Sequence, residues 1–283
     1  MNLNIEERYR VVFGDSDTFR ILLVGVGGTG SSLALALGGL MVHARQKGIH
    51  IDLTLVDDDR IEEKNIGRQE FATASSMHGG VHKCADIALR LNAAYGLNIT
   101  AWPERYVVDM AGRWMRYSHT DTHLIIGCVD NDQGRQEIAK TVEGYSGQLW
   151  AIDSGNAAFN GQILVGNTTN REHVQLGKLG LCTALPSPYL QEPNLLLAEE
   201  ENQPLSCADL TLREEQSLMV NRMAATITAQ YVYNMSIRRQ LTQLSTAFNL
   251  EPTVMTPTFI TETTVATCFP RTEAVVTREV EDE

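Results

Sequence analysis

The chain has 283 residues, of which 43% are hydrophobic and 20% are charged. This composition is that of a globular protein with a sizeable core, and it excludes an intrinsically disordered chain. The formal net charge of −12 argues against a protein that grips nucleic acid mainly through its phosphates, because that grip depends on Lys and Arg.

Strands are predicted to alternate with helices through the first 166 residues. The expected strands lie at 21–25, 51–57, 98–104, 122–130, 148–154 and 161–166. The expected helices lie at 31–46, 81–94 and 133–142. Such alternation predicts an α/β fold with a mostly parallel sheet and helices on both faces. The uncharged stretch 21–42 is interpreted as a buried strand, turn and helix, because its glycines interrupt what would otherwise be a membrane span.

The second half of the chain has a different pattern. Residues 167–208 have no clear periodicity and are predicted to form a long, mobile crossover loop. A helix is expected at 211–239, and the β-like stretch 253–271 is expected to close the fold as a hairpin before an acidic tail. We therefore expect one domain over 1–283, with a core at 1–166 and a terminal helix and antiparallel strands at 209–283.

Cysteine usage points to a reducing compartment. The five cysteines are widely spaced and form no CxxC pair, so neither a zinc site of the usual spacing nor a disulfide framework is expected. Together with the absence of a recognisable secretory signal, this favours the cytoplasm.

Polar motifs follow three of the predicted strands. A glycine-rich loop (Gly25–Gly30) follows the first, Asp57 the second and Asp130 the fourth. In a parallel sheet these carboxyl ends meet at one crevice, which is where ligands bind. The sequence thus predicts a single ligand site at this edge.

The glycine loop GVGGTG matches G-x-G-x-x-G between a strand and a helix. Its glycines (Gly25, Gly27, Gly28 and Gly30) would let the backbone approach a phosphate, and the helix would offer free amides. The same pattern also arises from close strand–helix packing, so both interpretations remain open on this motif alone.

The stretch LVDDDRIEEKNIGRQ places many opposing charges at a strand end. Asp57 lies 27 residues after Gly30, whereas the ribose-binding acid of a nicotinamide site follows after about 20 residues. An NAD(P)-dependent oxidoreductase is therefore disfavoured but not excluded. The aspartates alone are also compatible with a polar strand exit.

Four motifs in order carry a family resemblance: GVGGTG, LVDDDRIEEKNIGRQ, the lysine of GGVHKCAD, and CVDN. They resemble the ThiF/MoeB-type adenylyltransferases and the adenylation domains of ubiquitin-activating enzymes, in the compact bacterial form. The resemblance covers about 21–166, and the helical segment 206–230 extends it to about 235. It implies a Rossmann-like single adenylation domain, and in many members a homodimer.

The resemblance implies that ATP and Mg²⁺, with no zinc, occupy the crevice. Asp57 would hold the ribose, the phosphates would lie against Asn65, Arg68 and Lys83, and Asp130 would hold the metal. The full set of implied nucleotide ligands is Gly25, Gly27, Gly28, Gly30, Asp57, Asp59, Asn65, Arg68, Gln69, Lys83 and Asn131. Arg68, Lys83 and Asp130 would also take part in catalysis.

The implied reaction is adenylation of the C-terminal glycine of a small ubiquitin-like or sulfur-carrier protein, followed by transfer to a cysteine. Cys207 matches the family position of that cysteine and precedes a helix, where a thiolate is favoured. Cys182 is the second candidate, and adenylation without a cysteine relay also remains open. In some members a ubiquitin-conjugating-like enzyme is a further partner.

Two arginines have weaker assignments. Arg10, in ERYRVV, would reach into the partner subunit's site or lie on the surface, and Arg135 would face the nucleotide or local acids. Two further functional alternatives are a non-catalytic partner subunit and a relative that adenylates a tRNA base. The net charge disfavours the latter, so neither nucleic acid nor a membrane is an expected partner.

Overall fold

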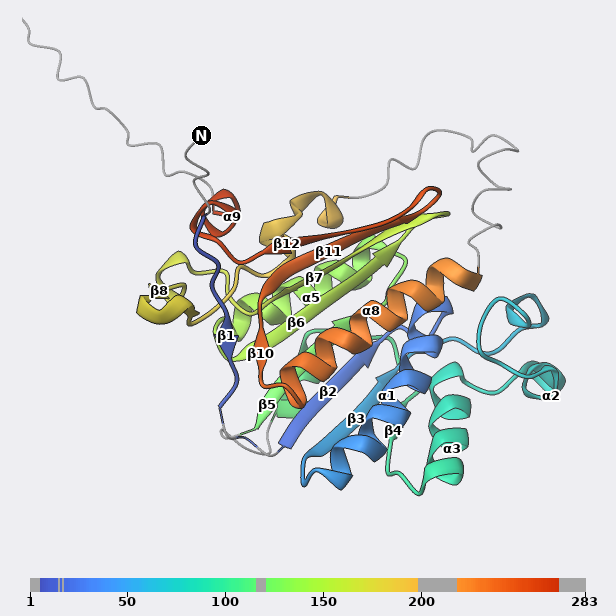
Figure 1. Ribbon diagram of the computed structural model, residues 1–283. Coiled ribbons are helices and arrows are strands. Elements are labelled where there is room, and N and C mark those ends of the chain that lie inside the picture. Colours follow the sequence, from blue (N-terminus) through green and yellow to red (C-terminus); the bar gives the residue numbers. More distant parts are fainter. Residues whose placement is uncertain (1–5, 15, 17, 116–120, 198–217, 270–283) are drawn as a thin grey trace, which may run out of the picture.

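An eight-stranded sheet forms the centre of the computed structural model (Figure 1), which describes residues 6–14, 16, 18–115, 121–197 and 218–269. Its strand order is β12-β11-β7-β6-β5-β2-β3-β4. The strands are β2 (Thr18–Val24), β3 (His50–Val56), β4 (Thr100–Trp102), β5 (Thr122–Gly127), β6 (Leu149–Asn156), β7 (Asn160–Gly166), β11 (Gln243–Leu250) and β12 (Thr253–Phe259). Pairing is parallel from β6 to β4 and antiparallel from β6 to β12. The predicted fold class is confirmed.

Helices cover both faces of the sheet (Figure 1). On one face lie α1 (Gly28–Gln46), α3 (Lys83–Tyr95) and α8 (Leu218–Ser236), and on the other lie α4 (Asp109–Trp114), α5 (Asp132–Gly144) and α6 (Pro188–Gln191). Strand β2 shows the division, because Ile21 and Leu23 join the core beneath α1 and α8, whereas Leu22 and Val24 join the core beneath α5. A strand with two buried faces must be apolar throughout, as β2 is at its carboxyl half.

Smaller elements surround the sheet. They are α2 (Thr73–Ser76), α9 (Glu262–Thr267), β1 (Val11–Val12), β8 (Leu176–Gly177), β9 (Leu181–Cys182) and β10 (Gln240–Leu241). Strand β1 pairs with β10, and β8 pairs with β9. None of the helices in the described ranges combines the length and the apolar character that a bilayer crossing requires.

The crossover segment is more ordered than the sequence pattern predicts. Its described part, 167–197, contains β8, β9, α6 and several single-turn helices, short elements that the expectation of a crossover loop did not include. Ser187 starts α6 by accepting a hydrogen bond from the Leu190 amide, and Pro188 occupies the first turn. Such short capped turns leave no periodic signal. Residues 198–208 lie outside the described part.

The C-terminal strands also differ from the prediction. Strand β12 ends at Phe259, and 262–267 is the helix α9, so the β-like interpretation of 253–271 is wrong at 262–267. Thr261 and Thr264 form a reciprocal capping box that starts α9, a local bond that outweighs the β preference of threonine. The hairpin partner of β12 is β11, which no expected strand covered.

Candidate functional site

A cavity of about 1160 Å³ opens at the carboxyl ends of β2, β3, β5 and β6. Its wall contains the glycine loop, the aspartates after β3, Arg68, Gln69, Lys83 and the segment Asp130–Arg135. The crevice predicted from the three strand ends therefore exists, and most of the sequence-predicted ligands meet there.

The glycine loop packs so closely against other backbone atoms that Gly25 and Gly30 leave no room for a side chain. Gly25 has φ +86°, and a Cβ there would lie 2.7 Å from the Cys128 carbonyl oxygen. A Cβ on Gly30 would lie 1.9 Å from the Gly25 carbonyl oxygen. Gly25, Gly27 and Gly28 line the cavity, whereas Gly30 lies beneath the turn. Gly30 thus fixes the shape of the loop rather than its surface.

Helix α1 presents its N-terminus to the same cavity. It begins at Gly28, has no side-chain cap, and carries no acidic residue in its first turn. The first amides of a helix have no intrahelical acceptor and carry partial positive charge. This end of α1 is suited to an anion such as a phosphate.

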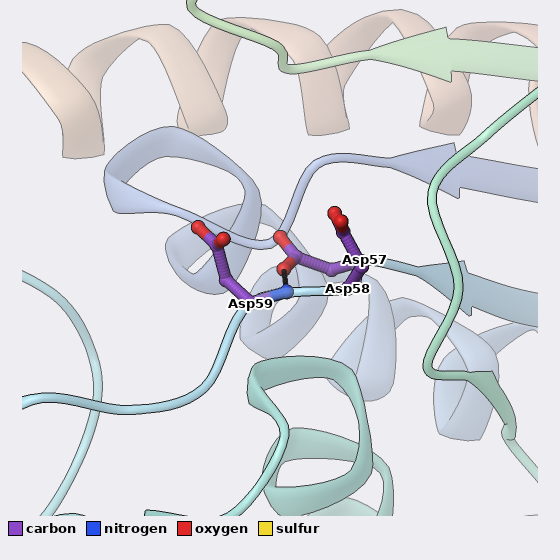
Figure 2. A group of neighbouring side chains, drawn as sticks. All are labelled: Asp57, Asp58 and Asp59. Carbon is purple, nitrogen blue, oxygen red and sulfur yellow. Dashed lines mark hydrogen bonds between the residues drawn. The ribbon is translucent and has the colours of Figure 1, made fainter.

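Asp57 joins the glycine loop to the turn after β3. The Val26 amide donates to its Oδ2 at 2.6 Å, and the Asp59 amide donates to its Oδ1 at 2.9 Å (Figure 2). Burial raises the pKa of Asp57, while the Val26 amide and Lys83 oppose that rise. Each oxygen keeps a lone pair for a further donor, so the carboxylate could accept a ligand hydroxyl.

The three aspartates of this turn stand close together. Ligand oxygens of Asp57, Asp58 and Asp59 lie within 4.8 Å of one another (Figure 2). The Lys83 ammonium, on the first residue of α3, offsets part of this charge through an ion pair of 2.7 Å with Asp59. Lys83 is 7% exposed, so its charge is held in place rather than free in solvent.

Arg68 and Gln69 offer unengaged groups to the cavity. Arg68 is exposed, and its guanidinium has no hydrogen bond or ion pair within the described ranges. The buried Oε1 of Gln69 also lacks a hydrogen-bond partner there. Buried polar atoms are nearly always satisfied, so the Gln69 oxygen suits a site completed by a ligand, and the exposed Arg68 guanidinium is available to an anion in the cavity.

Asp130 and Asn131 face the cavity from the carboxyl end of β5. Asn131 caps α5 by accepting the Gly134 amide at 2.7 Å, and its Nδ2 lies 3.3 Å from Oδ1 of Asp130. Asp130 is exposed. Its carboxylate is oriented from one side and open on the other, as a cation ligand requires.

Asn65 is not part of the cavity wall in the described structure. It is buried, and its Oδ1 accepts the Glu62 amide at 2.8 Å within the turn 63–65. This bond shapes the loop that carries Arg68. Arg10 also lies outside the wall, with its backbone bonded to Gly180 and Cys182.

Of the two cysteine candidates, only Cys182 lies within the described residues. Cys207 lies outside the described residues. Cys182 is buried, donates its thiol to the Ala184 carbonyl at 3.0 Å, and has a pKa raised by burial. Burial raises the pKa of Cys84 in the same way, to about 11. A raised thiol pKa opposes thiolate formation.

Four polar residues in or next to the cavity wall were not predicted to lie together. They are Arg135, Asp153, Asn156 and Asn221. Asn156 ends β6, and Asn221 comes from α8, 192 residues after Thr29, to which it is bonded. Arg135 lines the cavity, and its Nε lies 3.5 Å from the buried carboxylate of Asp153. Arg135 therefore lies beside a local acid and in the cavity wall, and its facing a nucleotide stays a prediction. Asn156, Asp153 and Asn221 could not be predicted, because each is a single polar residue in or beside an apolar run and belongs to no recognisable motif.

The sequence matches the model of the ThiF family over residues 15–258. The chain belongs to the ThiF family. No curated protein matches its sequence. Its fold is similar to that of PaaA, at 16% identity and a TM-score of 0.53 over 87% of the chain.

The fold is also similar to that of E. coli MccB. The structure of MccB with ATP gives 14% identity and a TM-score of 0.56 over 86% of the chain. MccB with MccA-N7isoAsn gives 13% and 0.56 over 87%. The chain spans 64–66% of the length of the two MccB structures and 65% of that of PaaA. At these identities the likeness concerns the fold.

Proposed function

We propose that this ThiF-family protein is an ATP-dependent adenylyltransferase that activates the C-terminal carboxylate of a small protein. The observation that carries the proposal is the convergence in one cavity of a glycine loop, the Asp57 carboxylate, two cations and the Asp130 carboxylate. A nucleoside triphosphate needs hydrogen-bond donors and positive charge for its phosphates, an acceptor for its ribose hydroxyls, and a ligand for its metal ion. MccB, which has a similar fold, has been crystallised with ATP.

The residues fit the nucleotide from both ends. Asp57 would accept the ribose hydroxyls, and the N-terminus of α1 would receive the phosphates. Lys83 and Arg68 add positive charge, and a hydroxyl or amino group of the nucleoside would donate to the unpartnered Gln69 Oε1. Asp130 would hold Mg²⁺, which prefers oxygen ligands such as carboxylates and phosphates. The metal would supply positive charge that stabilises the phosphate negative charge.

The proposed reaction takes place at the α-phosphorus of ATP. A carboxylate oxygen of the substrate attacks the α-phosphorus, the bond from that phosphorus to the bridging β-oxygen breaks, and pyrophosphate leaves with the electron pair. Negative charge builds on phosphate oxygens, where the cations of Lys83 and Arg68 would stabilise it, and Lys83 is already held in place by Asp59. The product is an acyl-adenylate.

The substrate is proposed to be a small ubiquitin-like or sulfur-carrier protein that ends in glycine. Family membership and the MccB structures, one with ATP and another with AMPCPP and MccA, support an acyl substrate that meets ATP in this fold. We further propose a thioester relay through Cys207. The other candidate, Cys182, is less suited to this role because it is buried and its thiol donates a hydrogen bond to a backbone carbonyl. A homodimer and a conjugating enzyme as partner complete the proposal.

Pyrophosphate exchange tests the reaction. Purified small ubiquitin-like proteins ending in glycine would be incubated with the enzyme, Mg·ATP and labelled pyrophosphate, each beside the same protein lacking that glycine. The proposal predicts label in ATP only with the intact C-terminus, and at least about 100-fold less exchange for Asp130→Ala. Exchange that continues unchanged in Asp130→Ala would remove the metal-ligand role.

The cysteine relay has a separate readout. Cys207→Ala should retain exchange but lose a thioester that reducing agent cleaves, whereas Cys182→Ala should keep both. A thioester that survives Cys207→Ala and disappears in Cys182→Ala would reverse the assignment.

A further inference from the structure

One cavity-lining side chain comes from a part of the chain remote from the other ligands. Asn221 lies in the first turns of the described α8, is 5% exposed, and lines the cavity beside the glycine loop. It is separated from Gly28 by most of the sequence, and none of the motifs that indicate a nucleotide site includes it.

The Asn221 carboxamide is oriented by two neighbours. Its Oδ1 accepts from the Thr29 hydroxyl at 3.0 Å and from Asn156 Nδ2 at 2.8 Å. Two donors therefore fix the oxygen on one side. The Nδ2 amide is left pointing the other way, and it makes no hydrogen bond within the described ranges.

The free Nδ2 lies against the backbone where α1 begins. A Cβ on Gly28 would be 2.4 Å from Nδ2, closer than any side chain allows, so the absence of a side chain at Gly28 makes room for this amide. The uncapped first turn of α1 starts at the same residue. An N–H donor with no acceptor, on a cavity-lining side chain beside the free amides of a helix, has the chemistry of an anion ligand.

We propose that the Asn221 Nδ2 amide is a phosphate-binding donor of the nucleotide site, which α8 adds to the donors of the glycine loop. This inference rests on the proposed function, because the anion it takes is a phosphate of ATP. Thr29 and Asn156 act as positioning residues, since they hold the carboxamide by its oxygen. The phosphate site is therefore built from both ends of the chain, and it is complete only when α8 is packed on α1.

Calorimetric binding of ATP and of adenosine, both with Mg²⁺ at pH 8, tests the proposal. Asn221→Ala removes the donor, and the expected loss of ATP affinity is about 10-fold. Asn221→Asp keeps the shape and the acceptor oxygen but sets a carboxylate against the phosphates, so a larger loss of about 100-fold is expected. Adenosine affinity should stay within about twofold in both variants, because adenosine has no phosphate.

Asn234→Asp is the matched control. It makes the same change on α8, 13 residues and about 20 Å further along the helix, and ATP affinity should stay within about twofold. Thermal unfolding of each variant shows that it is folded, and Asn221→Ala alone decides if Asn221→Asp does not fold.

Three results would overturn the inference. They are unchanged ATP affinity in Asn221→Ala, an equal loss of ATP and adenosine affinity, and a loss in Asn234→Asp as large as in Asn221→Asp. Failure of the proposed function looks different, because wild-type protein would then bind no ATP at all, and the inference would fall with it.

Discussion

The two walls of the cavity hold their polar groups in different ways. The charged wall (Asp57, Asp59, Arg68 and Lys83) contains ionised groups, and its buried ammonium is already paired with Asp59. The amide wall (Asn131, Asn156 and Asn221) contains neutral carboxamides fixed by hydrogen bonds. An anionic ligand must compete with Asp59 at the first wall, whereas it meets a preformed donor at the second.

This difference has a consequence for specificity. Charge–charge attraction falls with salt and does not depend strongly on geometry. Amide donors on packed helices are directional and nearly independent of salt. The charged wall should thus dominate phosphate affinity, and the amide wall should fix the position of the phosphates.

The glycine loop joins the two walls. A substitution that distorts this loop should have the largest effect on stability. Gly30→Ala puts a Cβ 1.9 Å from the Gly25 carbonyl oxygen, and the resulting shift of the backbone should cost about 3 kcal/mol or more. Gly39→Ala, in open space on the same helix, should instead stabilise the protein by about 0.5–1 kcal/mol. Urea unfolding of both measures this. Equal effects at the two positions would contradict the packing role of Gly30.

Asp153 lies behind the amide wall and predicts a pH dependence. Burial raises its pKa from 3.8 to about 6, although Arg135 opposes the rise. Because the folded pKa is the higher one, the stability that Asp153 contributes is present below pH 4 and is lost as the pH rises through 6. The loss is at most about 3 kcal/mol.

The matched variant for this pH effect is Asp153→Asn. Urea unfolding between pH 4 and 7.5 should show wild type losing stability relative to Asp153→Asn as the pH rises, with little further change above pH 7. Parallel curves over this range would show that Asp153 does not titrate as its burial indicates.

Lys83→Gln sharpens the comparison at the charged wall. Removing a charged donor should lower ATP affinity by roughly 10- to 100-fold, from about 1.5–3 kcal/mol, and should weaken its salt dependence. Lys64→Gln is the control, because Lys64 has an ion pair of the same length, 2.7 Å, on the exposed surface. Calorimetry at two salt concentrations measures both. Equal losses in the two variants would mean that Lys83 acts only through net charge.

The smallest effect is expected at the rim of the charged wall. Arg105 and Asp58 are separated by 3.4 Å, with side chains 69% and 46% exposed. Exposed pairs contribute about 0–1 kcal/mol. Arg105→Gln should therefore change the unfolding free energy by less than about 1 kcal/mol. A larger change would show that this pair supports the wall.

The charged wall could be predicted from sequence and the amide wall could not, for a physical reason. Asp57 follows a strand end, Arg68 lies on the loop that leaves the same strand, and Lys83 begins a helix. A parallel sheet gathers the positions at its strand ends by topology alone. Asn221 reaches the cavity only because α8 packs on α1, a contact that no local pattern encodes. Asn156 is the last residue of the buried strand β6, where a single polar residue is also typical of a strand that ends at the surface.

The fold shows the same division. The main strands and helices of the alternating half, 18–166, follow from apolar runs and glycine turns, because each has a local signal, whereas the short helices α2 and α4 were not expected. Strand β11 was missed because Thr246 occupies a buried position between Leu244 and Phe248 and blurs the apolar pattern. Helix α9 was missed because a capping box of threonines resembles a strand. Long-range pairing and local caps decided these elements.

Thermal unfolding with saturating Mg·ATP and, separately, NAD(H) tests the central claim most directly, because it needs no protein substrate. A ligand at 100 times its dissociation constant stabilises the folded state by about 2.7 kcal/mol, which raises the melting temperature by several degrees. The account predicts a Mg²⁺-dependent rise with ATP that Asp130→Ala loses and that NAD(H) does not reproduce. A rise with NAD(H) alone would contradict the adenylyltransferase proposal, and no rise with either ligand would favour a non-catalytic partner subunit.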